Sequence, residues 1–225
     1  NNFVDMFNLL DLSWVPFSRY VFNTVIIALI GTAGHVLLAS MCAFAFAKYS
    51  FRGSKFLFHT VVLALMFNTT VTAIPNFIIM SRLHWVDTYF AVIVPTFAAS
   101  LGLYLMKQFM ETMIPDSLIE AAEIDGANKW YIFWKIAMPN VRPAWLTLIV
   151  FTFQGLWNSG STVYIQSEQL KTVNYALSQI MAGGSIARAG AGAAATVVMM
   201  LPPMIVFMLT QSNIVATMAT SGMKD

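Results

Sequence analysis

The chain has 225 residues, of which 58% are hydrophobic and only 10% charged. This composition excludes an ordinary soluble domain and indicates a protein that lies in a lipid bilayer. The net charge of +2 is too small to suggest a nucleic-acid partner, and the single cysteine, Cys42, can form neither an internal disulfide nor a cysteine-based metal site.

Residues 1–19 mix charged and aromatic side chains, which is typical of an interfacial lead-in at headgroup level. The remaining residues, 20–225, are expected to form one transmembrane domain. Crossing a bilayer takes roughly 20 apolar residues, and five stretches qualify as spans. They cover residues 20–47, 56–80, 89–106, 144–164 and 193–212. The sequence therefore predicts an all-α fold, a polytopic membrane helix bundle.

Three features modify these spans. Ala39, Ala43 and Ala47 lie four apart in the first span, which would let a neighbouring helix approach closely. The second span carries polar residues and a proline, which lipid would not tolerate on an exposed face, so they are expected to face protein or a water-filled path. Pro202-Pro203 is expected to interrupt the last span.

Between the third and fourth spans, residues 107–143 hold five of the ten acidic and four of the twelve basic residues. Ser117 and Glu120 have the spacing of a capping box, which predicts a short helix after Pro115. Gly126 can end that helix in the left-handed conformation. The segment therefore predicts two short helices joined by a glycine turn.

The second short helix of this segment is expected to begin at Asn128 and to end at Pro139. Trp130, Phe133, Trp134 and Ala137 fall at spacings of three and four, so we expect them to share one face.

The distribution of Lys and Arg predicts which side of the membrane each segment occupies. Eight basic residues fall on the side of segment 107–143, and four fall on the other. The positive-inside rule therefore places residues 107–143 and the carboxyl end in the cytoplasm, and the loop 165–192 outside. Five spans then start outside, so we expect a sixth, amino-terminal span that this sequence lacks.

One pattern in the segment 107–143 is specific enough to indicate a protein family. Glu120-Ala121-Ala122, followed by Gly126, Ile136 and Pro139 at fixed spacings, resembles the EAA loop of bacterial ABC-importer permeases, with Met138 where Leu is usual. Phe153-Gln154-Gly155-Leu156-Trp157-Asn158 is similar to a segment of the carbohydrate-importer permeases, the group of the smaller maltose-importer membrane subunit. Ser159-Gly160 departs from that pattern.

This resemblance implies a type I ABC-importer permease that imports a sugar or oligosaccharide across the bacterial inner membrane. It implies a second homologous permease, two cytoplasmic ATPase subunits and an extracytoplasmic sugar-binding protein as partners. In such permeases the loop docks on the ATPase and couples its closure to alternating access. The residues carried over to this ATPase-coupling role are Glu120, Ala121, Ala122, Asp125, Gly126, Ile136 and Pro139.

The chain cannot power transport itself. It has no G-x-x-x-x-G-K-[ST] phosphate-binding motif, so ATP and Mg are expected on the separate ATPase and no cofactor on this chain. No His, Asp and Glu grouping has metal-ligand spacing, so we assign neither a metal site nor a catalytic residue.

A substrate path is the second candidate site. Sugars bind by aromatic stacking and by amide and hydroxyl hydrogen bonds, which selects polar and aromatic residues within the spans. The candidates are Asn68, Thr72, Asn76, Tyr104, Gln154, Trp157 and Asn158. Each could equally form an interhelical hydrogen bond. The outer loop could touch the binding protein or simply connect two helices.

Two other functional classes stay open. An ATP-independent secondary transporter usually holds charged groups at membrane depth, whereas the five predicted spans contain no Asp, Glu, Lys or Arg. A purely structural membrane subunit needs no polar face inside the bundle, and the polar residues of the second span argue against it.

Overall fold

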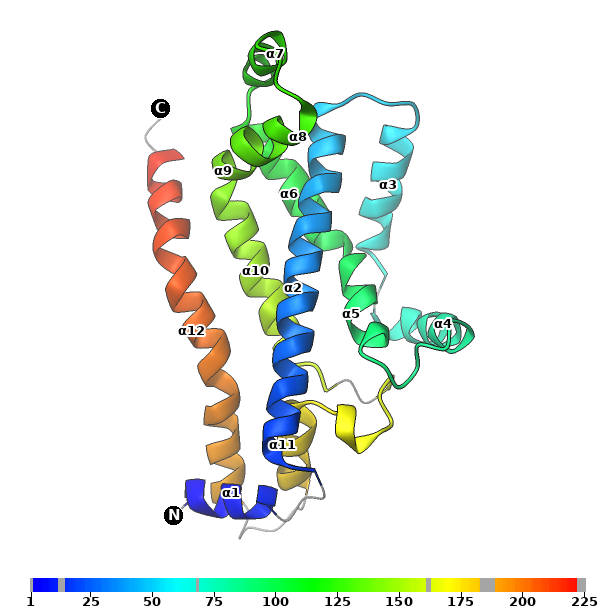
Figure 1. The fold of residues 1–225 in the computed structure, drawn as a ribbon, viewed down its shortest axis with the longest axis vertical. Coiled ribbons are helices and arrows are strands. Elements are labelled where there is room, and N and C mark those ends of the chain that lie inside the picture. Colours follow the sequence, from blue (N-terminus) through cyan, green and yellow to red (C-terminus); the bar gives the residue numbers. More distant parts are fainter. Residues whose placement is uncertain (1, 12–14, 68, 161–162, 183–188, 222–225) are drawn as a thin grey trace. The chain divides into compact units, whose positions relative to one another are not determined.

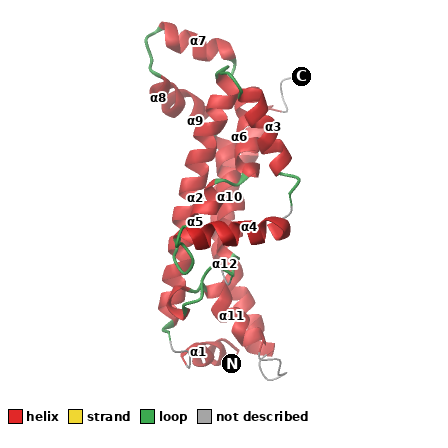
Figure 2. Cartoon of the chain, turned by 90° about the vertical axis from the view of Figure 1, so that its right-hand side faces the viewer, coloured by secondary structure: helices red, strands yellow, loops and turns green. Residues whose placement is uncertain are grey.

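The computed structural model describes residues 2–11, 15–67, 69–160, 163–182 and 189–221. These residues form helices joined by turns, with no strand among them (Figures 1 and 2), which confirms the predicted all-α class. The helices are α1 (Asn2–Asp11), α2 (Phe17–Lys48), α3 (Ser54–Ala64), α4 (Thr69–Arg82), α5 (Phe90–Phe97), α6 (Ser100–Met113), α7 (Asp116–Ile124), α8 (Lys129–Tyr131), the π-helix η1 (Ile132–Ala137), α9 (Met138–Asn140), α10 (Arg142–Trp157), the 3-10 helix η2 (Glu168–Leu170), α11 (Val173–Ala182) and α12 (Ala189–Ser221).

The chain divides into two compact units. Unit 1 comprises residues 1–32, 73–96 and 150–209, and unit 2 comprises residues 33–72, 97–149 and 210–225. Each unit has its own hydrophobic core.

The core of unit 1 joins α1, the start of α2, α11 and the first half of α12. Met6 and Leu10 of α1 are buried four residues apart, so part of the predicted lead-in is a helix with a packed face. The predicted outer loop 165–192 contains η2 and α11. In α11 the buried side chains recur at helical spacing, at Val173, Ala176, Leu177 and Ile180.

The core of unit 2 joins the second half of α2, α6, the segment after α6 and the start of α10. Ala39 and Ala43 are buried there, and the small Ala side chains leave room for close packing as predicted. Gly102 of α6 lies against α2 so closely that a Cβ atom would lie 2.2 Å from Nε2 of His35.

The predicted spans differ from the observed helices in several places. The range 56–80 contains two helices, α3 and α4, and the range 89–106 is divided between α5 and α6. Within the described residues, three helical stretches are long and apolar enough to cross a membrane: Phe17–Lys48, Phe90–Met113 and Ala189–Gln211. A fourth results if Lys129–Asn140 and Arg142–Trp157, bent by 80°, count as one. The number of spans therefore stays a prediction.

The expected interruption of the last span at Pro202-Pro203 is wrong, because α12 continues through both prolines. A proline in a helix leaves the carbonyl four residues earlier without its donor. For Pro203 this carbonyl belongs to Met199, and it accepts a 3.2 Å hydrogen bond from the indole Nε1 of Trp157. A side chain of α10 thus replaces the donor that Pro203 lacks.

Candidate functional site

The charged segment between α6 and α10 forms a structure that we call the elbow, residues Asp116–Asn140, made of α7, α8, η1 and α9. α7 begins at Asp116, and its N-cap residue is Pro115, which makes no side-chain capping bond. The predicted capping box of Ser117 and Glu120 is therefore wrong, because Ser117 already lies inside the first turn. Asp116 instead places a carboxylate at the positive end of the helix dipole.

The end of α7 is closed by a Schellman motif around Gly126. The Ala127 amide donates to the carbonyl of Ala122 at 2.9 Å, and the Gly126 amide donates to the carbonyl of Glu123 at 3.1 Å. Gly126 has φ of +82°, a conformation that glycine adopts without steric cost. The predicted glycine stop is confirmed.

Asn128 caps the next helix as predicted, since its Oδ1 accepts from the amide of Tyr131 at 2.8 Å. The predicted single face is only partly right. Phe133 and Ala137 are buried, whereas Trp130 and Trp134 are 61% and 49% exposed. The reason is the π-helix η1, which changes the residue spacing around the helix axis, so that Ile132 and Ala137, five apart, are both buried.

Pro139 lies one residue before the end of the continuous helical stretch Lys129–Asn140, so the predicted end of the second short helix is correct to within one residue. The π-helix η1 directly precedes this end, and the amide of Met138 donates to the carbonyl of Phe133, five residues earlier. The chain turns at Val141, where the bend between Lys129–Asn140 and Arg142–Trp157 is 80°. The indole of Trp145 spans this bend by donating to the carbonyl of Met138 at 3.0 Å.

The elbow is attached to the rest of unit 2 by buried and charged contacts. Ile119 of α7 packs into the core, and the Phe133 ring lies 5.5 Å from the Phe44 ring of α2. Lys48, the last residue of α2, donates to the carboxylate of Asp116 at 2.7 Å. Burial raises the pKa of the neighbouring Tyr49 hydroxyl, and the carboxylate of Glu123 raises it further.

All seven predicted ATPase-coupling residues lie on the elbow. Glu120, Ala121, Asp125 and Gly126 are exposed on α7 and at its end, while Ala122 and Ile136 are half-buried and Pro139 is exposed. An open hollow of about 460 Å³ lies between α7 and the helices that follow. It is lined by Ala122, Asp125, Gly126, Ala127, Asn128, Tyr131 and Ile136.

The predicted substrate-path residues are not gathered in one place. Asn68 lies outside the described residues; Thr72 and Tyr104 belong to unit 2, and Asn76, Gln154, Trp157 and Asn158 belong to unit 1. The Tyr104 ring stacks on that of Phe58, with centroids 6.2 Å apart. Trp157 is buried and bonded to Met199, while Gln154 and Asn158 are exposed. The substrate role of these residues stays a prediction.

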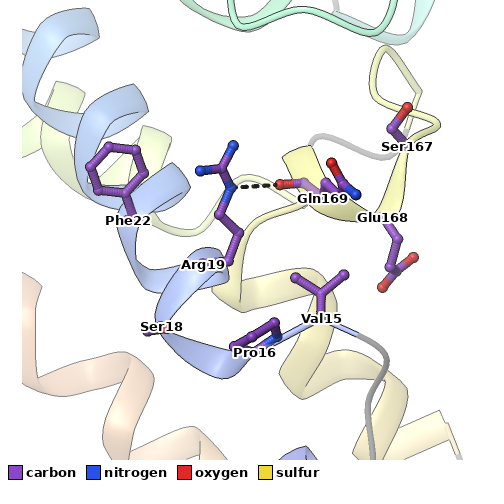
Figure 3. Close-up of a pocket in the computed structure, with 8 residues that line it drawn as sticks. All are labelled: Val15, Pro16, Ser18, Arg19, Phe22, Ser167, Glu168 and Gln169. Atoms are coloured by element: carbon purple, nitrogen blue, oxygen red, sulfur yellow. Dashed lines mark hydrogen bonds between the residues drawn. The ribbon is translucent and has the colours of Figure 1, made fainter.

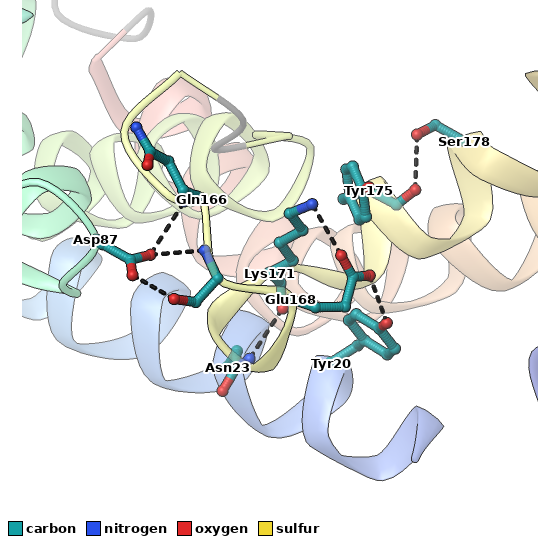
Figure 4. Close-up of polar contacts among 9 residues, drawn as sticks. Tyr20, Asn23, Asp87, Gln166, Glu168, Lys171, Tyr175 and Ser178 are labelled. Carbon is teal, nitrogen blue, oxygen red and sulfur yellow. Dashed lines mark hydrogen bonds and ion pairs between the residues drawn. The ribbon is translucent and has the colours of Figure 1, made fainter. Parts of the chain in front are cut away.

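Unit 1 contains a polar network that the sequence reasoning missed. Asp87, at a left-handed φ of +64°, accepts from the amides of Gln166 and Ser167 at 3.0 and 2.8 Å and from the Ser167 hydroxyl. These bonds hold the pKa of the Asp87 carboxyl below its ordinary value, the Ser167 hydroxyl having the largest effect. Figure 4 shows Asp87 against the loop that contains Gln166 and Glu168.

The same network continues to α2 (Figure 4). Asn23 donates to the carbonyls of Gln169 and Lys171 at 2.8 and 2.9 Å, and Tyr20 donates to Glu168 at 2.7 Å. Burial alone would raise the pKa of Glu168, but hydrogen bonds from Lys171 and Tyr20 and the Lys171 charge lower it overall. The segment 164–173 is therefore fixed to two other elements of unit 1.

A hollow of about 920 Å³ lies beside this network (Figure 3). Arg19 extends along it and donates from Nε to the carbonyl of Gln169 at 3.3 Å. Its lining is Val15, Pro16, Ser18, Arg19, Phe22, Ser167, Glu168 and Gln169. Across the described residues, no group of three or more His, Cys, Asp or Glu side chains is placed to hold a metal ion.

Comparison with known proteins decides the family. Residues 35–220 match the family described as binding-protein-dependent transport system inner membrane component. The chain belongs to this family. The matched range includes the whole elbow, so the resemblance to ABC-importer permeases that the Glu120–Pro139 pattern indicated is confirmed.

Individual relatives of this permease are distant. It is 28% identical to the arabinooligosaccharides transport system permease protein AraQ of Halalkalibacterium halodurans, over 100% of this chain and 79% of that protein. It is 29% identical to the sn-glycerol-3-phosphate transport system permease protein UgpE of Yersinia enterocolitica, over 87% and 70% of the two chains. A chain in the crystal structure of a bacterial ABC transporter involved in the import of the acidic polysaccharide alginate has the same fold, with a TM-score of 0.77 at 24% identity over 92% and 78% of the two chains.

Proposed function

We propose that this permease is one membrane subunit of an ATP-driven, binding-protein-dependent importer of a sugar or oligosaccharide. The observation that carries this proposal is the elbow, in which four of the seven predicted coupling residues line one open hollow. Its family is the inner membrane component of binding-protein-dependent transport systems, which places this surface in a transport protein.

The elbow couples ATP hydrolysis to transport by docking on an ATPase subunit. The Schellman closure and the Asn128 cap satisfy backbone groups at the turn between its helices, so the turn is firm. The small side chains of Ala121 and Ala122 permit close approach of a partner. Ile124, which is 85% exposed at the end of α7, offers an apolar contact. A rigid, exposed elbow would transmit the movement of the ATPase subunit, whereas a flexible loop would absorb it.

The importer contains further subunits. We propose a second homologous permease, two cytoplasmic ATPase subunits that bind ATP and Mg, and an extracytoplasmic sugar-binding protein. The excess of basic residues on the elbow side supports a cytoplasmic elbow and carboxyl end in the inner membrane. The network of Asp87 and segment 164–173 then lies on the outer side, where the binding protein arrives.

The substrate class rests on the relatives. AraQ is named for arabinooligosaccharides and the alginate transporter for an acidic polysaccharide, which favours a saccharide. UgpE is named for sn-glycerol-3-phosphate, so a small phosphorylated polyol is the second candidate. The ATP-independent secondary transporter and the purely structural membrane subunit are both less consistent with the family.

The test is transport by the assembled importer in liposomes. We expect uptake that requires ATP and the external binding protein, and loss of ATPase association or coupling in Glu120→Lys and Gly126→Pro variants that still reach the membrane. Uptake driven by an ion gradient without the ATPase would contradict the proposal. So would normal substrate-stimulated ATP hydrolysis in both variants.

A further inference from the structure

Two consecutive residues at the end of α2, Lys48 and Tyr49, hold the elbow. Nζ of Lys48 lies 2.5 Å from the carbonyl oxygen of Ile114 and 2.7 Å from Oδ1 of Asp116. The Lys48 side chain is only 3% exposed, whereas that of Asp116 is 80% exposed. A buried ammonium group needs such partners, because burial without them disfavours its charge. The ammonium group of Lys48 therefore binds the two residues at which α6 ends and α7 begins.

Tyr49 reaches the other end of α7. Its hydroxyl donates to Oε1 of Glu123 at 3.4 Å, and Nζ of Lys129 lies 4.4 Å from its ring centroid. The ring also packs edge-on against Phe44 of α2, with centroids 5.5 Å apart. One tyrosine therefore contacts the last turn of α7 and the first residue of α8.

These contacts matter because α7 has few buried side chains of its own. Ile119 is the only buried one, and Ala122 is half-buried against the same core. Its connection to α6 consists of Ile114 and Pro115, both in extended conformation. Ile114 is fully buried and anchors the start of this connection, whereas Pro115 is exposed. The contacts of Lys48 and Tyr49 therefore add to the attachment that Ile114 and Ile119 provide.

We propose that Lys48 and Tyr49 form a latch that fixes both ends of α7 to α2, so that a displacement of α7 moves α2 instead of bending the connection at Ile114 and Pro115. The two residues are positioning residues, since neither belongs to the predicted docking surface. This proposal rests on the proposed coupling function of the elbow and adds the path by which movement leaves it.

The experiment uses the assembled importer, purified by an affinity tag on this chain and reconstituted in liposomes. Lys48→Met keeps the length of the side chain and removes its charge, while Lys48→Arg retains the charge. Tyr49→Phe removes only the bond to Glu123. Lys55→Met is the matched control, because Lys55 is an exposed lysine on α3. Two quantities are measured: hydrogen exchange at the amides of α7, and substrate moved per ATP hydrolysed.

We expect Lys48→Met to lower the protection of α7 amides about tenfold, the scale of one lost charge-assisted hydrogen bond. Substrate moved per ATP should fall with it. Lys48→Arg should restore most of both quantities, Tyr49→Phe should have a smaller effect, and Lys55→Met none. Should Lys48→Met fail to assemble, Tyr49→Phe and Asp116→Asn provide the same two readouts.

Two results would overturn the latch. One is unchanged α7 protection in the assembled Lys48→Met importer, and the other is lowered protection with an unchanged amount of substrate per ATP. Failure of the proposed function is recognised separately, since Glu120→Lys on the docking surface would then leave coupling intact whatever the latch variants do.

Discussion

Trp157 donates its indole N–H to the carbonyl oxygen of Met199 at 3.2 Å, and this carbonyl is the one that Pro203 leaves without a helical donor. The Trp157 side chain is 7% exposed and its ring stacks on that of Phe153. A position selected as a possible sugar contact therefore has a clear part in holding α12 together.

The stability contributed by the Trp157 indole should therefore depend on whether position 203 is a proline. Trp157→Phe should lower the free energy of unfolding by about 1 kcal/mol, because it removes one hydrogen bond and leaves a carbonyl unpaired. In a Pro203→Ala background the new amide can donate to Met199, so the same change should cost clearly less. Thermal unfolding of the four variants in detergent measures both costs. Equal costs in both backgrounds would contradict this account.

Gly126 lies in the elbow and Gly53 lies outside it, and the two have the same backbone conformation, so Gly53 serves as a control for Gly126. Both have positive φ, +82° and +88°, and an added Cβ would meet nothing within 4 Å at either. Alanine at each position should therefore cost a similar amount of stability, about 1 kcal/mol. Only Gly126→Ala should lower the ATP hydrolysis that substrate-loaded binding protein stimulates. Equal stimulation in the two variants would show that the turn after α7 has no special role in coupling.

Gly102 marks a tight contact between α6 and α2. A Cβ there would lie 2.2 Å from Nε2 of His35 and 3.0 Å from a methyl group of Leu148. Gly102→Ala should destabilise the protein by about 1–3 kcal/mol through overpacking. Gly155→Ala on α10 is the control, because no atom lies within 4 Å of the added Cβ and alanine favours helix. A melting temperature for Gly102→Ala at or above that of Gly155→Ala would refute the close contact.

The hydrogen bonds that attach Gln166 and Ser167 to the Asp87 carboxylate should weaken in acid. Its carboxylate accepts from Ser167 and Gln166, which lowers its pKa. A depressed folded-state pKa gives stability that is present at neutral pH. That stability is lost as the pH falls below the ordinary Asp value toward the folded one. The protection of the amides in residues 164–170, meaning their exchange rate relative to the intrinsic rate at the same pH, should therefore fall on acidification in the wild type.

Asp87→Asn is the control, because asparagine tolerates the left-handed backbone but does not titrate in this range. The amides of residues 164–170 should be less protected in this variant than in the wild type at neutral pH. Their protection should also fall less on acidification, and the fall that remains comes from Glu168, whose pKa is lowered as well. The same pH dependence in Asp87→Asn and wild type would exclude Asp87 as the titrating group.

The features that the sequence predicted correctly are those that depend on local chemistry. The helical class follows from composition, the Gly126 stop from glycine's left-handed conformation, and the Asn128 cap from its short amide side chain. The buried face of α11 has the apolar spacing of a helix, and this signal could have identified α11 within the predicted loop.

The features that it missed depend on distant partners. In the sequence Lys48 is only one of several basic residues that indicate a membrane side, since no pattern places it beside Asp116, 68 positions away. The π-helix moved Trp130 and Trp134 out of the buried face, and no simple spacing rule signals such an insertion. The expected break of α12 at Pro202-Pro203 is wrong for the same reason: the N–H that replaces the missing donor comes from Trp157, which lies on another helix.

The claim that the elbow docks on the ATPase is tested most directly by cross-linking. A cysteine is introduced at Ala121 on α7, in a background where Cys42 is replaced by serine, and is labelled in the assembled importer with a maleimide-benzophenone, which bonds to any adjacent chain on irradiation. A cysteine at Phe56 of α3, which is 75% exposed, is the control. We predict that Ala121→Cys links to the ATPase subunit, that the yield changes when ATP is added, and that Phe56→Cys does not link. An assembled importer in which Ala121→Cys forms no link, or links no more than Phe56→Cys, would contradict the account.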